Sequence, residues 1–230
     1  MRKITTIIFD LDGTLVDTLP DIADAMNQVL SRHGLPTRPA DSYRALIGRG
    51  IQSMISRLAP DCDSAMQSVL YSDFITRYNN HCCDRSTCYP DITQMLEQLR
   101  ASGYTLAIFS NKRDDLTEKV VKHFFRTDTF KVVKGHTEGT PQKPHPVSTT
   151  GLLTSLNTIP ARTILIGDTA VDVDTARALD MDCLGVNWGY QSADHLMAAG
   201  ATTILDHPDQ IFDWLEQYNT SSKVVTGHSA

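Results

Sequence analysis

The sequence predicts an α/β protein with a doubly wound, Rossmann-like parallel sheet and an inserted all-α segment. Apolar runs that are typical of buried strands alternate with amphipathic helical patterns along most of the chain. A long stretch between the first two strands, about residues 19–89, instead has apolar residues at helical spacing. The length of 230 residues is sufficient for one full core and a smaller accessory unit.

Five strands are predicted in the core, at residues 3–9, 105–109, 130–133, 163–166 and 183–186. The first ends in the uninterrupted apolar run Ile7 to Phe9, which favours a buried parallel strand over an exposed hairpin. In the inserted segment, one helix runs from about Ile22 to Leu30, before a glycine and a proline. Two more are predicted around residues 51–58 and 66–75, by the same apolar spacing.

Composition and charge exclude several classes of protein. The net charge of -6, without any Lys/Arg run, argues against nucleic acid or a membrane surface as a partner. The apolar stretch near the N-terminus meets Asp10 after few residues, so neither a signal peptide nor a membrane span is expected, and we predict a cytoplasmic protein. The five cysteines, an odd number, are predicted to be reduced thiols.

The first strand leads directly into Asp10-Leu11-Asp12-Gly13. Residues i and i+2 of an extended chain point the same way, so Asp10 and Asp12 should project together from the carboxyl end of this strand. Two such carboxylates repel each other unless a metal ion or a shared proton relieves the repulsion. The alternative is a surface turn, because Asp and Gly are both common in turns.

Three later motifs complete a pattern: Ser110-Asn111 after the second core strand, Lys143 in Lys143-Pro144-His145-Pro146, and Gly167-Asp168 followed by Asp172. With them, the chain resembles the haloacid dehalogenase superfamily of phosphohydrolases, specifically its phosphoglycolate-phosphatase-like branch. The resemblance implies a catalytic core at residues 1–17 and 89–219 and a helical cap of the four-helix type at residues 18–88. The polar tail, residues 220–230, is predicted to be mobile.

The resemblance also implies catalytic and metal-binding roles. Asp10 would attack phosphorus as the nucleophile, and Asp12 would be the general acid and then the base. Asp10, the Asp12 backbone carbonyl and Asp168 would hold Mg²⁺, an ion that prefers oxygen ligands. Asp172 would orient metal-bound waters or Lys143. Without the other motifs, Asp168 and Asp172 would simply suit the start of a helix.

The remaining site predictions concern the substrate. The Ser110 hydroxyl and either the side-chain amide or the backbone of Asn111 would donate hydrogen bonds to the phosphate, and Lys143 would neutralise its charge. Arg49, between two glycines in the inserted segment, would pair with a substrate carboxylate, although a helix break with a surface arginine explains the same pattern.

The predicted function is Mg²⁺-dependent hydrolysis of a small anionic phosphomonoester through an aspartyl-phosphate intermediate. The leading substrate is 2-phosphoglycolate. Asp12 favours phosphate over halide, because a halide leaving group needs no proton. A pyrophosphatase, a sugar phosphomutase or a non-catalytic sensor of phosphorylated ligands stays open as an alternative, and the oligomeric state is not predicted.

Overall fold

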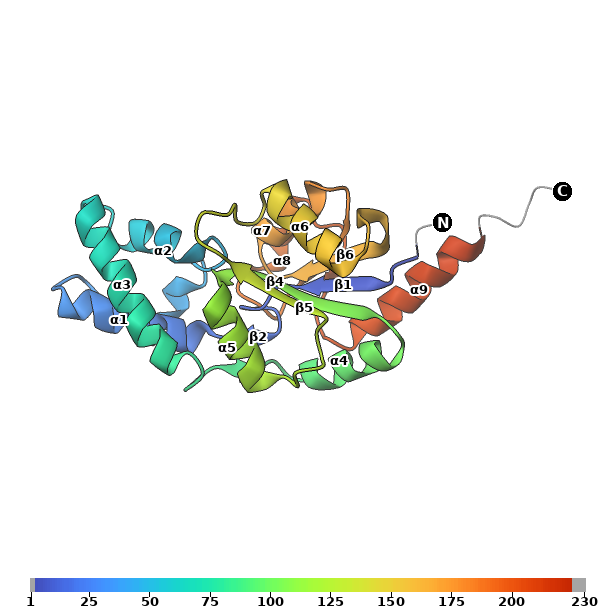
Figure 1. Ribbon diagram of the computed structural model, residues 1–230, viewed down its shortest axis with the longest axis horizontal. Coiled ribbons are helices and arrows are strands. Elements are labelled where there is room, and N and C mark those ends of the chain that lie inside the picture. The colour runs from blue at the N-terminus through green and yellow to red at the C-terminus, as the bar shows by residue number, and fades with distance from the viewer. Residues whose placement is uncertain (1–2, 225–230) are drawn as a thin grey trace.

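The computed structural model describes residues 3–224 and contains a six-stranded parallel sheet with helices on both faces (Figure 1). The strands are ordered β5-β4-β1-β6-β7-β8. Their bounds are β1 Thr6–Phe9, β4 Thr105–Arg113, β5 Val132–His136, β6 Thr163–Gly167, β7 Asp182–Val186 and β8 Ile204–Leu205. The predicted doubly wound core is thus confirmed.

The two faces of the sheet are covered by different helices. Ile7 and Phe9 of β1 belong to the same apolar cluster as residues of α4 (Ile92–Ala101), α5 (Asp114–Phe124) and α9 (Gln210–Val224). Ile8 points the opposite way, into a cluster with α6 (Pro146–Leu156) and α7 (Ala170–Arg177). The remaining core helices are α8 (Ala193–Ala199) and the short 3-10 helix η2 (Pro160–Arg162).

Each predicted core strand is present with shifted ends. The largest change is in β4, which continues beyond Phe109 through Ser110 and Asn111 to Arg113, with an irregular register against β5. Helix α9 continues to Val224, so the first residues of the predicted mobile tail are helical. Residues 225–230, the rest of that tail, lie outside the described residues.

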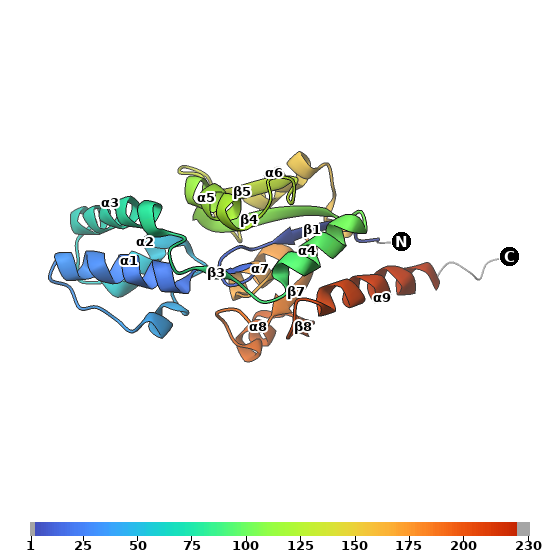
Figure 2. The ribbon, with the colours of Figure 1, turned by 90° about the horizontal axis from the view of Figure 1, so that it is seen from below.

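The inserted segment lies beyond the carboxyl ends of the strands (Figures 1 and 2). It contains α1 (Leu19–Arg32), the 3-10 helix η1 (Ala40–Tyr43), α2 (Gly50–Leu58) and α3 (Ser64–His81). This differs from the expected four-helix type, because η1 is a single 3-10 turn. Its interior is formed by large buried side chains, among them Met26, Tyr43 and Phe74.

Two short strands join the segment to the core. β2 (Val16–Asp17) pairs antiparallel with β3 (Thr87–Cys88), so the outgoing and returning chains lie side by side. The buried carboxylate of Asp21 accepts hydrogen bonds from the backbone N–H groups of Arg85 and Ser86. These contacts fix the position of the returning chain against α1.

The sheet order determines where a ligand can bind. From β1 the chain passes to β4 and β5 on one side, and later to β6, β7 and β8 on the other. The connections therefore diverge at β1, and the crevice at the carboxyl ends of such strands is where open α/β sheets bind ligands.

Candidate active site

Asp10 lies at this divergence point, directly after β1. Its backbone N–H donates to the Ile166 carbonyl of β6 at 2.9 Å, and its side chain is buried. Burial raises its pKa from the ordinary 3.8 to about 7. Lys143, whose Nζ lies 3.0 Å from Asp10 Oδ1, opposes this rise, whereas the negative charges of Asp172 and Asp12 add to it.

Asp168 follows β6 and is also completely buried. Its carboxylate accepts hydrogen bonds from the Thr14 hydroxyl and from the Tyr190 backbone N–H, both at 2.8 Å. Burial raises the pKa of Asp168 well above its usual value, and repulsion from Asp10 and Asp172 acts in the same direction. Asp168 is therefore well oriented, but its negative charge is poorly compensated.

Asp172, in the first turn of α7, is fully engaged by protein groups. One oxygen accepts hydrogen bonds from the Thr169 backbone N–H and hydroxyl, and the other pairs with Lys143 Nζ at 2.8 Å. Lys143 Nζ also donates to the Phe109 carbonyl at 2.8 Å. Although burial disfavours its charge, Asp10 and Asp172 outweigh burial and raise the pKa of Lys143.

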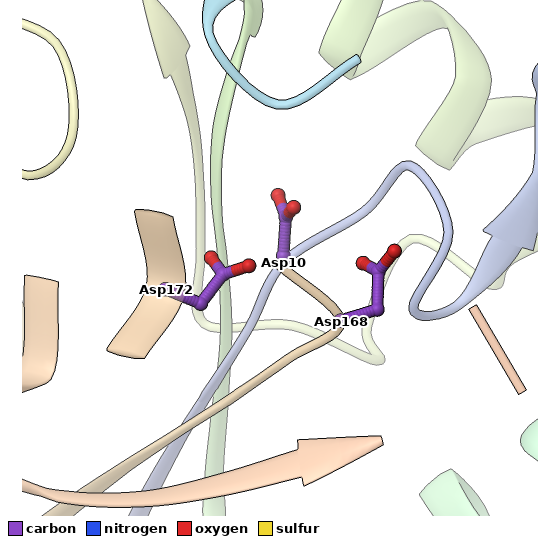
Figure 3. Close-up of side chains that lie close together, drawn as sticks. All are labelled: Asp10, Asp168 and Asp172. Carbon is purple, nitrogen blue, oxygen red and sulfur yellow. The ribbon is translucent and has the colours of Figure 1, made fainter. Parts of the chain in front are cut away.

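The three carboxylates are close enough to share one cation. Asp10, Asp168 and Asp172 offer oxygens within 4.8 Å of one another, and Asp10 lies between the other two in Figure 3. An all-oxygen set suits a hard cation such as Mg²⁺, and the raised pKa values of Asp10 and Asp168 indicate negative charge that a cation would relieve. All three carboxylates also contact protein groups, and Asp172 has the most of these contacts, so Asp10 and Asp168 are better suited to a metal.

Asp12 is not part of this carboxylate cluster, although it lines the same cavity as Asp10. Its oxygens accept hydrogen bonds from Lys112 Nζ at 2.7 and 3.0 Å, and the Thr18 hydroxyl donates to it at 2.6 Å. Its side chain is thus separate from the carboxylates suited to a metal, as expected if only its backbone carbonyl is a ligand.

Ser110 and Asn111 are positioned differently from each other. Ser110 is buried at the cavity wall, and its oxygen accepts a hydrogen bond from the Lys112 backbone N–H. The Asn111 side chain donates to the carbonyls of Gly48 and Lys143 and accepts from the Lys143 backbone N–H. Both side-chain N–H bonds of Asn111 are therefore in use, which leaves its backbone as the group that could donate to a phosphate in the cavity that Asn111 lines.

The loop containing Arg49 lies against the site, but the arginine side chain does not reach the cavity. Gly48 and Gly50 line the cavity beside Asp10 and Asp12, whereas Arg49 is exposed and is not among the lining residues. The loop is therefore near the site, as predicted, but the predicted guanidinium contact is not supported by this arrangement.

Four site residues were not identified from the sequence: Lys112, Tyr78, Thr18 and Tyr190. Lys112 directly follows the Ser110-Asn111 motif, and strand β4 contains both Ser110 and Lys112. This proximity in the sequence could have identified Lys112 as a site residue. Tyr78 comes from α3 and Tyr190 from the loop after β7, and only the fold brings them to Lys112 and Asp168, respectively. Trp188, whose indole N–H donates to the Thr14 carbonyl, supports the loop after β1.

The sheet is parallel, and buried carboxylates lie at the point where its connections diverge. This arrangement defines the class of the protein, a doubly wound α/β enzyme. Residues 7–186 match the model of the haloacid dehalogenase-like hydrolase family, and the chain belongs to this family. The resemblance found in the sequence is therefore confirmed.

Individual relatives match over nearly the whole chain. A phosphoglycolate phosphatase of Psychrobacter arcticus is 29% identical, with 91% of this chain and 94% of the relative covered. An N-acetylmuramic acid 6-phosphate phosphatase of Pseudomonas aeruginosa is 27% identical, with 94% and 96% covered. The crystal structure of a predicted phosphoglycolate phosphatase from Haemophilus somnus is similar with a TM-score of 0.86 and 26% identity, covering 93% of this chain and 99% of that chain. Among residues 3–224, no helix is long and apolar enough to cross a membrane.

Proposed function

We propose that this chain is a Mg²⁺-dependent phosphomonoester hydrolase that acts through an aspartyl phosphate on Asp10. The observation that carries the proposal is the placement of Asp10, buried at the end of β1 between the Lys143 ammonium and the Asp168 carboxylate. The phosphatases among its relatives support the reaction class, and they favour a small anionic substrate, with 2-phosphoglycolate first.

Two displacements account for the reaction. An Asp10 oxygen forms a bond to phosphorus while the bond from phosphorus to the leaving oxygen breaks, and Asp12 gives that oxygen a proton. Asp12 then takes a proton from water as the water oxygen attacks phosphorus. The bond between Asp10 and phosphorus breaks, and inorganic phosphate and free Asp10 result. Asp12 is beside Asp10 in the cavity wall, which suits both transfers.

The other residues of the site prepare this reaction. Lys143 holds Asp10 in place and offsets the charge that accumulates when one anion attacks another. Ser110 supplies a hydroxyl from the end of the apolar part of β4 to the phosphate. Asp10, Asp168 and the Asp12 carbonyl would hold Mg²⁺, which when bound polarises the phosphoryl oxygens. Asp172 orients Lys143.

The inserted segment has the position of a cap. Its residues Ile22, Met54 and Phe74 line the same cavity as Asp10 and Asp12. We take residues 18–88 as the cap and residues 1–17 and 89–219 as the core, joined through the β2–β3 pair. Contacts from the cap would exclude water and recognise the leaving group.

Phosphate release from a panel of phosphoglycolate, sugar phosphates, nucleotides and pyrophosphate, with and without Mg²⁺, tests the proposal. We expect metal-dependent release that is strongest with phosphoglycolate and is lost in Asp10→Asn. A preference for pyrophosphate or a sugar phosphate would show that this compound, and not phosphoglycolate, is the substrate. Release that persists in Asp10→Asn, or no release from any compound, would contradict the mechanism.

A further inference from the structure

We propose that Lys112 and Tyr78 form a subsite for the anionic end of the substrate's leaving group. This inference deepens the proposed phosphatase function and rests on it. It assigns substrate recognition to a core lysine and a cap tyrosine, instead of to the exposed Arg49. The expected ligand group is a carboxylate joined to the phosphate by a short carbon linker.

The cavity over Asp10 contains a single cation among the described residues that line it. Its wall is mostly apolar, with side chains of α1, α2 and α3 facing the ends of β1 and β4. Lys112 is the one lysine or arginine in this wall, and its side chain is only 3% exposed. Because Asp10 and Asp12 line the same small space, a second anionic group would meet strong repulsion unless Lys112 bound it.

Neither of the other two candidate cations can take this role in the observed arrangement. Both lysines have protein partners, Lys143 in Asp10 and Asp172 and Lys112 in Asp12 and Tyr78, but only Lys112 lines the cavity. Arg49 is exposed to solvent outside the lining.

Tyr78 supplies an independent sign of a ligand. Its side chain is buried, lines the cavity, and stacks on Phe74 with ring centroids 5.2 Å apart. The phenol oxygen accepts a hydrogen bond from Lys112 Nζ at 2.9 Å, but among residues 3–224 no acceptor takes the hydroxyl hydrogen. A buried donor without an acceptor is costly, so a substrate oxygen at this position would be favourable.

The spacing of the subsite favours a short acid. Lys112 Nζ lies 2.7 Å from Asp12, the residue that would protonate the leaving oxygen. An anion bound by Lys112 and Tyr78 is therefore close to that leaving oxygen, as the carboxylate of phosphoglycolate is. The cavity itself is small, about 50 Å³, and apolar side chains of the cap line it.

The test compares 2-phosphoglycolate with 2-hydroxyethyl phosphate, in which a neutral hydroxymethyl group replaces the carboxylate. The measured quantity is the ratio of their kcat/KM values. We expect Lys112→Met to lower this ratio by about 10- to 100-fold, and Tyr78→Phe by about 10-fold, as for loss of charge-assisted and neutral hydrogen bonds. The control Lys122→Met removes an exposed lysine of α5 that pairs with Glu118 on the surface, and it should leave the ratio unchanged.

Other outcomes would overturn the assignment. If Lys112→Met lowers kcat/KM equally for both compounds, Lys112 only positions Asp12. If Arg49→Met lowers the ratio of kcat/KM values and Lys112→Met does not, Arg49 binds the substrate carboxylate.

Calorimetric binding of both compounds to the Asp10→Asn protein, with and without Lys112→Met, separates the subsite from the chemistry. If the wild-type protein releases no phosphate, the proposed function fails. A specific loss of phosphoglycolate affinity in Lys112→Met would still support the subsite, and unchanged affinity would contradict it.

Discussion

At the scale of single residues, the site contains several negatively charged groups that are buried where water cannot screen them. Asp10, Asp168 and Asp172 are buried together, and within this group Lys143 is the compensating cation. Burial and mutual repulsion therefore raise the pKa of Asp10 and of Asp168. This arrangement destabilises the metal-free folded protein, and binding of a cation stabilises it.

Asp168→Asn tests this charge balance. We expect the variant to be more stable than the wild type in EDTA at about pH 8, by on the order of 1 kcal/mol or more, because one buried charge is removed. The wild-type protein should gain thermal stability with MgCl₂, and the variant should gain little. Thermal unfolding with EDTA or MgCl₂ measures both effects, and an equal Mg²⁺ gain in the variant would exclude Asp168 as a ligand.

Lys143→Met should have the opposite effect on stability. Removing the buried ammonium leaves Asp10 and Asp172 without their cation, which should cost roughly 3–5 kcal/mol of unfolding free energy. Urea unfolding at neutral pH measures this loss. Lys122→Met, which removes an exposed lysine, is the matched control. A loss for Lys143→Met no larger than that of the control would contradict the proposed ion-pair network.

Among the residues of the site, sequence patterns identified those that follow strands. Asp10, Ser110 and Asp168 come after apolar runs, and parallel strands bring their ends to one edge. Lys112 and Tyr78 could not be paired in this way, because their contact depends on how α3 packs over β4. Asn111 was expected to bind phosphate through its amide or backbone because it follows a strand, and the contacts of its side-chain amide with the Lys143 and Gly48 loops depend on the fold.

At the scale of elements, the turn after β1 determines how closely the carboxylates approach. Gly13 has a φ of 88°, and a Cβ added there would lie 2.3 Å from Asp168 Oδ2 and 2.8 Å from the Tyr190 ring. A side chain at position 13 is therefore disfavoured both by the backbone conformation and by space. The turn and the loop after β7 enclose Asp168 from two sides.

Gly13→Ala should displace Asp168 and weaken the site. A displacement of about 1 Å can cost roughly 100-fold in rate, so we expect a loss of phosphate release of this order with a modest fall in thermal stability. Steady-state kinetics across MgCl₂ concentrations measure the effect. Wild-type kinetics in the variant would show that the turn adapts and that this close approach is not required.

The elements themselves were predicted unevenly from the sequence. Long apolar runs identified β1, β4, β5, β6 and β7, and helical spacing identified α1, α2 and α3. The two-residue strands β2, β3 and β8 are too short to show a period, and they form only because neighbouring chain supplies partners. The tail boundary was misplaced because polar residues after position 219 still extend α9.

At the scale of the whole molecule, the buried carboxylates should make stability depend on pH. The pKa of Asp10 rises from 3.8 in its ordinary state to about 7 in the folded protein. Between these values the folded protein keeps a proton that the unfolded chain has lost. The contribution of Asp10 to stability is therefore fully present below the lower value and is lost as pH rises through the higher one.

The metal-free wild type should consequently lose unfolding free energy relative to Asp10→Asn between about pH 4 and about pH 7, by at most roughly 1.4 kcal/mol per pH unit. Urea unfolding of both proteins in EDTA across this range measures the difference. A difference that does not change with pH would show that Asp10 is not protonated in the folded state.

The division into core and inserted segment follows from the sheet order and the sequence together. The insertion interrupts the chain after β1, so its helices lie over the carboxyl ends of the strands, where the carboxylates gather (Figure 2). Sequence spacing predicted the helices of the insertion, but their packing against Lys112 required the structure. Net charge, -6 for the whole chain, gave no sign of the buried cations on which the site depends.

The central claim is that Asp10 becomes phosphorylated during turnover. The most direct measurement is acid quenching of the enzyme during phosphoglycolate hydrolysis, borohydride reduction, and location of the modified residue by peptide mass spectrometry. We predict conversion of Asp10 to homoserine, dependent on substrate and Mg²⁺. Rapid phosphate release with no modified residue under a quench that traps a known acyl phosphate, or with modification of a different carboxylate, would contradict it.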